Sequence, residues 1–296
     1  MALVLSLLSP YFLTMDNLLA IGLQMAVVAI MALGQMMVII SSGIDLSVGS
    51  VMALSGVGTT MLMAQGMPIF PAVVAGLAVG ALCGLLTGAL VGWGYVPPFI
   101  VTLGMMGIAR GAALLLTGGV PVFGLSAQFG FWGGGRIYGV LPVPVLFTVV
   151  LAVLAHFLLT MTAFGRHVFA IGSNMTAAKL SGIDVNRTLL LVYLINGILC
   201  GFAGIILASR LSTGQPTAGT GYELDVIAAC VIGGASLSGG KGSILGAIIG
   251  ALIMGILRNG CNLLDISEFW QKIAIGVIIV MAVFIDQYRK HKVQHI

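Results

Sequence analysis

The chain has 296 residues, of which 59% are apolar and only 7% are charged, and its mean hydropathy is +1.18. Soluble domains carry about 25% charged residues, so this composition excludes a soluble globular protein and indicates an integral membrane protein. The net charge is +4, and basic residues cluster at 166–187 and 289–292. That distribution is typical of cytoplasmic loops and does not indicate a nucleic-acid-binding surface.

Long apolar runs follow a short opening segment. Residues 1–8 are too few to span a membrane and lack the leader of a secretory signal peptide, so we expect a curtailed first segment. The later runs do not alternate polar and apolar residues, which predicts helices rather than barrel strands. They cover residues 18–40, 47–64, 70–92, 98–117, 143–162, 188–209, 224–237, 243–258 and 270–286. The expected fold is an all-α membrane bundle of about 9–10 spans, forming a single transmembrane domain over residues 1–296.

A polar interruption at residues 41–50 follows the first long run and carries the carboxylate of Asp45. An ionised Asp facing lipid at the centre of a helix costs roughly 2.5 to 3.5 kcal/mol, so we expect Asp45 inside the bundle or beside water. Gly43, Gly49 and several serines flank it and can satisfy backbone groups released from a helix. The stretch therefore predicts a helix break at a protein-lined cavity.

The basic clusters also set the expected topology. If the loop 163–187 and the tail after residue 287 are both cytoplasmic, an even number of crossings separates them. The run 224–237 must then either cross the membrane or pair with its neighbour as a broken element, and its shortness and glycines favour the second alternative. Counting backward places 118–142, with the interfacial aromatic residues Trp132 and Tyr138, on the outside.

A second interruption, at residues 233–243, resembles the first. Both place a Leu-Ser-x-Gly core between an incoming and an outgoing apolar run, and both have the same orientation in the expected topology. Two such breaks in a parallel pseudo-repeat point to a membrane translocation site. The alternative is close helix packing through small residues, since a chain with 43 glycines produces such similarities by chance.

Signatures of catalysis, nucleotide binding and metal binding are incomplete. The Gly-Gly-Lys at 239–241 is not a phosphate loop, because Ala235 and Gly242 occupy positions where that loop needs glycine and a hydroxyl residue. The four cysteines are widely spaced, and His156 and His167 lack a second ligand at helical spacing. We expect no catalytic residue, metal site or cofactor in this chain.

The loop 163–187 predicts a short helix, which Ser173 or Asn174 can cap and Gly182 can end after Leu180. A small helix with alanines, held outside the membrane, could dock into a cleft of a partner. The simpler alternative is a solvated basic loop that obeys the orientation rule.

Four long motifs, in this order, resemble those of the membrane permeases of bacterial ribose-type ABC sugar importers. The resemblance runs from about Ser9 to the C-terminal tail. The motifs are Ser42-Gly-Ile-Asp-Leu-Ser-Val-Gly-Ser50, Ala170-Ile-Gly-Ser-Asn174 with Ala177-Ala-Lys-Leu-Ser-Gly-Ile183, Gln215-Pro-Thr-Ala-Gly-Thr-Gly-Tyr-Glu-Leu-Asp225 and Gly233-Gly-Ala-Ser-Leu-Ser-Gly-Gly-Lys-Gly242.

The resemblance implies a permease subunit, itself not an enzyme, that works in the bacterial inner membrane beside a second permease copy. A cytoplasmic ABC ATPase would bind ATP and Mg²⁺, and a periplasmic sugar-binding protein would deliver the substrate. D-ribose is the first candidate; the alternative is another sugar or a furanose-like signal molecule. The implied contacts with the ATPase are Asn174, Ala177, Ala178, Leu180 and Gly182, and those with the binding protein are Gln215, Thr217 and Thr220.

A neutral sugar needs a path lined by hydroxyls, amides and backbone groups rather than by strong charges. The candidates for the path or its gate are Ser41, Ser42, Asp45, Ser47, Asn196, Ser236 and Ser238. An ion-coupled secondary transporter is the alternative class, in which Asp45, Glu223 and Asp225 would serve as intramembrane carboxylates.

Overall fold

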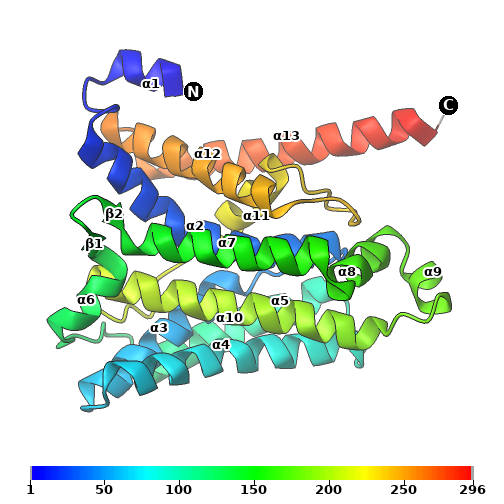
Figure 1. Cartoon of the computed structure of the whole chain (residues 1–296), viewed down its shortest axis with the longest axis horizontal. Coiled ribbons are helices and arrows are strands. Elements are labelled where there is room, and N and C mark those ends of the chain that lie inside the picture. Colours follow the sequence, from blue (N-terminus) through cyan, green and yellow to red (C-terminus); the bar gives the residue numbers. More distant parts are fainter. Residues whose placement is uncertain (1, 295–296) are drawn as a thin grey trace.

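The computed structural model describes residues 2–294, apart from some side chains of the last helix, and this part of the chain forms thirteen helices and one small hairpin (Figure 1). The basic side chains at 289–292 lie outside the described ones. The elements are α1 (Ala2–Leu8), α2 (Met15–Ile40), α3 (Val48–Ala64), α4 (Ile69–Gly92), α5 (Pro98–Thr117), α6 (Ala127–Gly134), β1 (Arg136–Ile137), β2 (Leu141–Pro142), α7 (Val143–Met161), α8 (Ala163–Ser173), α9 (Met175–Leu180), α10 (Val185–Leu211), α11 (Tyr222–Ile232), α12 (Ile244–Leu263) and α13 (Glu268–Gln294).

The all-α membrane architecture is confirmed. Within the described residues, six helices are long and apolar enough to cross a membrane, namely α2, α4, α5, α7, α10 and α12. The two shorter helices α3 and α11 accompany the two polar interruptions. Because α11 has only 11 residues, the run 224–237 is not a full span, which favours the broken-element alternative.

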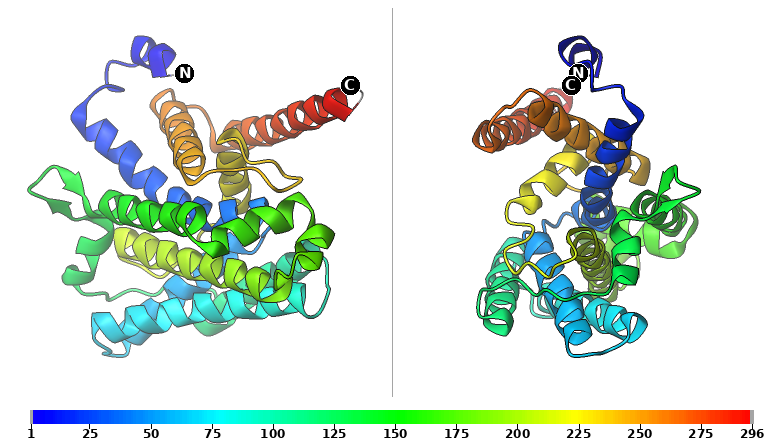
Figure 2. Two further views of the ribbon diagram at one scale, coloured as in Figure 1. Left: turned by 45° about the vertical axis from the view of Figure 1, so that its right-hand side comes forward. Right: turned by 90° about the vertical axis from the view of Figure 1, so that its left-hand side faces the viewer.

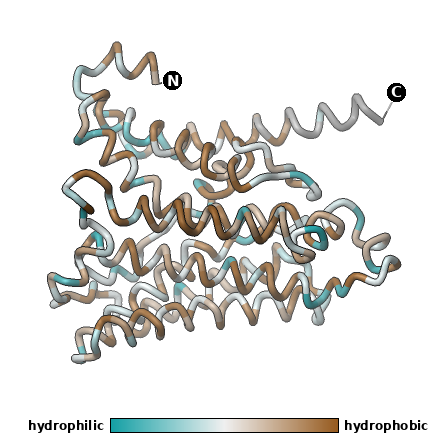
Figure 3. The backbone as a smooth tube through the Cα atoms, viewed as in Figure 1, coloured by the Kyte–Doolittle hydropathy of each residue, from teal (hydrophilic) through white to brown (hydrophobic). Residues whose placement is uncertain are grey.

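The long helices lie side by side along the longest axis of the molecule (Figure 1). The helix α6 and the β1–β2 hairpin lie at one end, and α8 and α9 lie at the other. Following the charge argument, we call the end with α8 and α9 the inner end and the opposite end the outer end. The long helices are mostly hydrophobic along their length, while hydrophilic residues gather at both ends of the molecule (Figure 3).

The helices α2 and α10 form the interior. Most of α2 is buried, and both views in Figure 2 show it between α12 and the layer that contains α4 and α10. Glycines bring α4 and α10 close together: a Cβ at Gly80 would lie 2.4 Å from the Gly197 carbonyl oxygen, and one at Gly84 would lie 2.3 Å from that of Tyr193. Packing through small residues is therefore present here, as membrane helix interfaces prefer.

Local sequence signals explain where several helices begin and end. The turn between α4 and α5 ends at Pro97, and α5 begins at Pro98, where a missing N–H costs nothing. The same helix ends at Gly118, whose φ of 62° is a left-handed conformation that glycine adopts readily. Ser243 caps α12 by accepting a hydrogen bond from the Gly246 N–H.

Candidate functional site

The carboxylate of Asp45 lies inside the protein, in the break between α2 and α3. One carboxylate oxygen accepts hydrogen bonds from the Ser47 backbone N–H at 2.8 Å and from the Ser47 hydroxyl at 2.6 Å. The other accepts from Nδ2 of Asn196, in the middle of α10, at 2.8 Å. Asp45 is only 5% exposed and Asn196 is fully buried. The break is thus fastened to α10 and shielded from lipid, as expected for irregular backbone at membrane depth.

Two glycines of this region make room for α10. A Cβ at Gly34 would lie 2.4 Å from Oδ1 of Asn196, and one at Gly43 would lie 2.5 Å from the hydroxyl of Tyr193. The Tyr193 hydroxyl and the side-chain amide of Gln35 are buried without a hydrogen-bond partner among the described residues. Neither residue was predicted from the sequence, although a glutamine inside the apolar run 18–40 is a visible signal.

The two polar interruptions meet at the inner end. The Gly240 N–H donates to the Ile40 carbonyl oxygen at 2.9 Å. The Ser42 hydroxyl lies 3.2 Å from the Ser238 carbonyl oxygen and 3.1 Å from that of Gly172, the penultimate residue of α8. We call these five residues, Ile40, Ser42, Gly172, Ser238 and Gly240, the inner junction.

The inner junction is tightly packed. A Cβ at Gly172 would lie 1.7 Å from the Ile40 carbonyl oxygen, so only glycine fits between the two breaks. The path candidates divide by exposure: Ser42 and Ser238 are exposed, whereas the buried ones are Ser41, Asp45, Ser47, Asn196 and Ser236. The breaks therefore form a closed joint in this conformation rather than an open channel.

The short helix α9 projects at the inner end, next to α8 (Figure 1). Oδ1 of Asn174 accepts a hydrogen bond from the Ala177 N–H at 2.9 Å, and Gly182, with φ of 84°, follows the helix. Ala178 is buried, whereas Met175 is 47% and Leu180 is 85% exposed. The predicted helix and its cap are confirmed, and the helix presents two large apolar side chains to its surroundings, of which Leu180 is the more exposed.

A cavity of about 410 Å³ lies beside α9, and it extends to the first break. It is lined by Ser41, Ser42 and Gly43, by the turn between α4 and α5, by the start of α10 and by Tyr193. Met175 and Lys179 of α9 form part of its wall. The cavity thus connects the surface around α9 with the inner junction.

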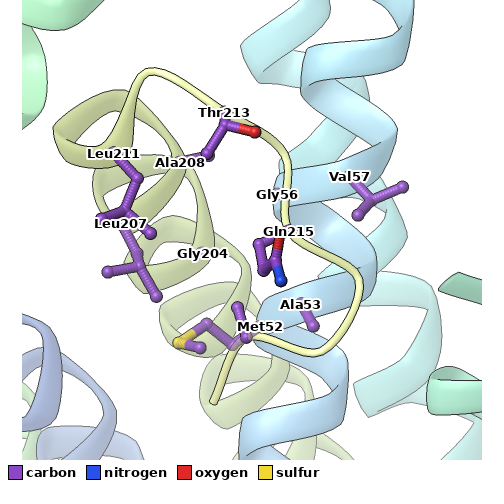
Figure 4. Close-up of a pocket in the computed structure, with 11 residues that line it drawn as sticks. Met52, Ala53, Gly56, Val57, Gly204, Leu207, Ala208, Leu211, Thr213 and Gln215 are labelled. Atoms are coloured by element: carbon purple, nitrogen blue, oxygen red, sulfur yellow. The ribbon is translucent and has the colours of Figure 1, made fainter. Parts of the chain in front are cut away.

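Residues 212–221 form an irregular segment between α10 and α11, and this segment lies beside α3 (Figure 4). Gln215 is half-buried, while Thr217 and Thr220 are exposed. Arg110 of α5 donates hydrogen bonds from Nη1 to the carbonyl oxygens of Pro216 at 2.6 Å and Ala218 at 2.8 Å. We did not identify Arg110 from the sequence, although an arginine within the apolar run 98–117 is itself a signal.

A second charged pair joins α11 to α12. Arg258 forms an ion pair with the buried Asp225, and its guanidinium lies 5.5 Å from the centre of the Tyr222 ring. Cation–π contact and ion pairing together stabilise an arginine at membrane depth. Within the described residues, no cluster of three or more His, Cys, Asp or Glu side chains is placed to hold a metal ion.

Comparison with known proteins gives near-complete matches. Residues 17–283 match the family described as "Branched-chain amino acid transport system / permease component". The chain is 47% identical to the ribose import permease protein RbsC of Escherichia coli strain K12 over 291 residues, which cover 97% of this chain and 90% of the relative. It is 43% identical to RbsC of Bacillus subtilis strain 168 over 288 residues, covering 97% and 89%. The D-allose transport system permease protein AlsC of Escherichia coli strain K12 is 40% identical over 282 residues, covering 95% and 86%. No solved structure matches the chain.

Proposed function

The chain belongs to the permease-component family of branched-chain amino acid transport systems, and on this basis we propose that it is the permease of an ATP-driven importer that moves a monosaccharide from the periplasm to the cytoplasm. It is a multi-pass membrane transport component and not an enzyme. D-ribose is the first substrate to test because the RbsC relatives carry that sugar in their names. The alternative is another sugar, such as the allose named for AlsC, or a furanose-like signal molecule.

The partners follow from this assignment. A cytoplasmic ABC ATPase binds ATP and Mg²⁺, a periplasmic sugar-binding protein presents the substrate, and a second permease copy completes the membrane part, all at the bacterial inner membrane. The chain forms one permease domain with its coupling loop at 163–187.

The observation that carries the proposal is the contact between α8 and both breaks. Gly172 of α8 lies against Ile40 and accepts from Ser42, and α9 follows α8 after the single residue Asn174. A displacement of α9 by the ATPase is transmitted along α8 to the inner junction. Since Ser42 also bonds to Ser238, the same displacement opens or closes the contact between the two breaks.

The carboxylates give little support to an ion-coupled carrier. The oxygens of Asp45 are engaged by Ser47 and Asn196, and Asp225 is paired with Arg258. A carboxylate that binds and releases an ion during each cycle needs free coordination sites, and these two have few. An outside motor fits the arrangement better.

The exposed side chain of Leu180 provides a test of coupling. We expect Leu180→Asp to lower ATP-dependent uptake at least about tenfold, because an apolar anchor in an interface contributes about 2 kcal/mol or more. The ATPase should then hydrolyse ATP without driving uptake, or dissociate from the permease. Leu180→Met is the matched control and should retain uptake. Normal uptake by Leu180→Asp would show that α9 does not couple the two subunits.

The substrate is tested by uptake in cells that lack their own ribose and allose importers. Cells that express the permease with its ATPase and binding protein should accumulate labelled D-ribose, and an excess of unlabelled ribose should compete better than allose or xylose. Accumulation of none of these sugars would refute the proposed substrate class.

A further inference from the structure

The segment 212–221 descends into the membrane part of the protein. Near its start, Gly214 packs against Thr60 of α3, where a Cβ would lie 1.9 Å from the threonine hydroxyl. Near its end, Gly219 lies against Gly49 at the beginning of the same helix. Gly49 and Thr60 are eleven positions apart in α3, so the segment descends by about 16 Å.

The depth of Gly49 follows from the neighbouring helix. α3 starts directly after the Asp45 break, and Asp45 is bonded to Asn196, which lies near the middle of the 27-residue helix α10. One to two turns further along α3, Met52 and Gly56 contact Gly204 of α10. Gly219 therefore lies near the middle of the bilayer, about 15 Å below the outer end of α10.

The exposed face of this segment is polar. Thr217 and Thr220 are exposed, Gln215 and Glu223 are half-buried, and Nε2 of Gln215 donates to the Thr217 hydroxyl at 2.9 Å. Among the hydrogen bonds of the described residues, none uses the proton of the Thr217 hydroxyl. Irregular backbone with exposed polar side chains does not face lipid at mid-bilayer depth, because its unpaired groups have no water there.

We propose that residues 215–220 form part of the wall of the translocation path, from near its outer end down to mid-membrane depth, where Gln215, Thr217 and Thr220 bind the hydroxyl groups of the passing sugar. This assignment rests on the proposed import of a neutral polyol. A carboxamide and two hydroxyls offer both donors and acceptors without a net charge, which suits such a ligand. These residues lie below the outer surface, so we assign them to the path and no longer to a contact with the binding protein.

Arg110 acts as the positioning residue of this wall. Its two hydrogen bonds hold the Pro216 and Ala218 carbonyl groups, and these residues flank Thr217. Glu223 lies close enough to Arg110 to interact with it electrostatically. Under the segment, only a gap of about 10 Å³ separates it from α3 and α10, so the wall is backed by packed helices (Figure 4).

The experiment is cysteine labelling of the complete transporter in intact cells. Thr217→Cys and Thr220→Cys are introduced in a Cys261→Ser background, since the other three cysteines are buried. The probe is a water-soluble, membrane-impermeant maleimide. Val153→Cys is the control, because Val153 is an exposed residue of the membrane helix α7, ten positions and hence about 15 Å from its outer end, so it faces lipid at a comparable depth.

We expect Thr217→Cys and Thr220→Cys to react at least about tenfold faster than Val153→Cys, and transport of D-ribose to slow that reaction. Equal, slow labelling at all three positions would overturn the proposal, because the segment would then face lipid or a protein interface. Fast labelling in a transporter that takes up no sugar would support the wall and refute the proposed function.

Discussion

Three charged residues in the membrane part, Asp45, Arg110 and Arg258, are each held by a small set of defined partners. Asp45 takes its hydrogen bonds from its own turn and from α10, Arg110 uses two backbone carbonyl groups, and Arg258 uses Asp225. An unpaired charge at this depth is costly, so each set fixes the position of an irregular segment or a short helix. Single residues of this kind decide where the breaks lie.

Loss of the Asn196 amide should destabilise the first break. We expect Asn196→Ala to lower the free energy of unfolding by about 1 to 3 kcal/mol, because a buried carboxylate loses a hydrogen bond. The apparent melting temperature of the detergent-solubilised protein measures this change. Thr160→Val, which removes a hydroxyl that bonds within its own helix, should leave the melting temperature unaltered. A thermally unchanged Asn196→Ala protein would mean that the bond to Asp45 is dispensable.

Loss of the Arg110 guanidinium should release the segment 212–221. We expect Arg110→Gln to change the maleimide labelling rate of Thr217→Cys several-fold and to lower sugar uptake, whereas Arg110→Lys should preserve part of both. Arg210→Gln is the control, since Arg210 bonds to the Leu23 carbonyl group on another helix. Identical labelling in the Arg110→Gln and parent proteins would show that Arg110 does not position this segment.

At the level of elements, local sequence patterns predicted where helices begin, end and break. They did not predict the contacts between residues far apart in the sequence. The break at 41–50, the second break at 233–243 and the capped helix after Asn174 all follow from glycine, serine and asparagine at recognisable positions. The contacts among Ser42, Gly172 and Ser238 join residues up to 196 positions apart, and no local signal encodes them.

The depth of residues 212–221 escaped prediction for a related reason. The segment is polar and rich in glycine, so it has the composition of an external loop. Its true position depends on close approaches of Gly214 and Gly219 to α3 and on the hydrogen bonds of Arg110, all of which are tertiary contacts.

The contact between the two breaks suggests a cross-linking test. In a Cys261→Ser background, we expect Ser42→Cys combined with Ser238→Cys to lose uptake when treated with a short bifunctional thiol reagent, because the inner junction must open in each cycle. Each single variant should keep its uptake under the same treatment. Efficient cross-linking without loss of uptake would indicate that the inner junction is static.

Considered as a whole, the molecule has an apolar outer surface that faces lipid. Inside it are two polar regions at different depths, the inner junction and the segment 212–221. The outer faces of α5, α7 and α13 carry large apolar side chains, such as Ile108, Phe157 and Phe269, which suit the bilayer. Inside, the inner junction connects to α8 and α9, and the segment 212–221 lies nearer the outer end. This arrangement leads to the central claim that an external motor at α9 opens the inner junction for a sugar.

The most direct test of that claim is sugar uptake by proteoliposomes of defined composition. We predict that labelled D-ribose accumulates only when the permease, its ATPase, the loaded binding protein and Mg-ATP are all present, and that Leu180→Asp lowers this accumulation at least about tenfold. Uptake by the permease alone, driven by a proton or sodium gradient and unaffected by Leu180→Asp, would contradict the account.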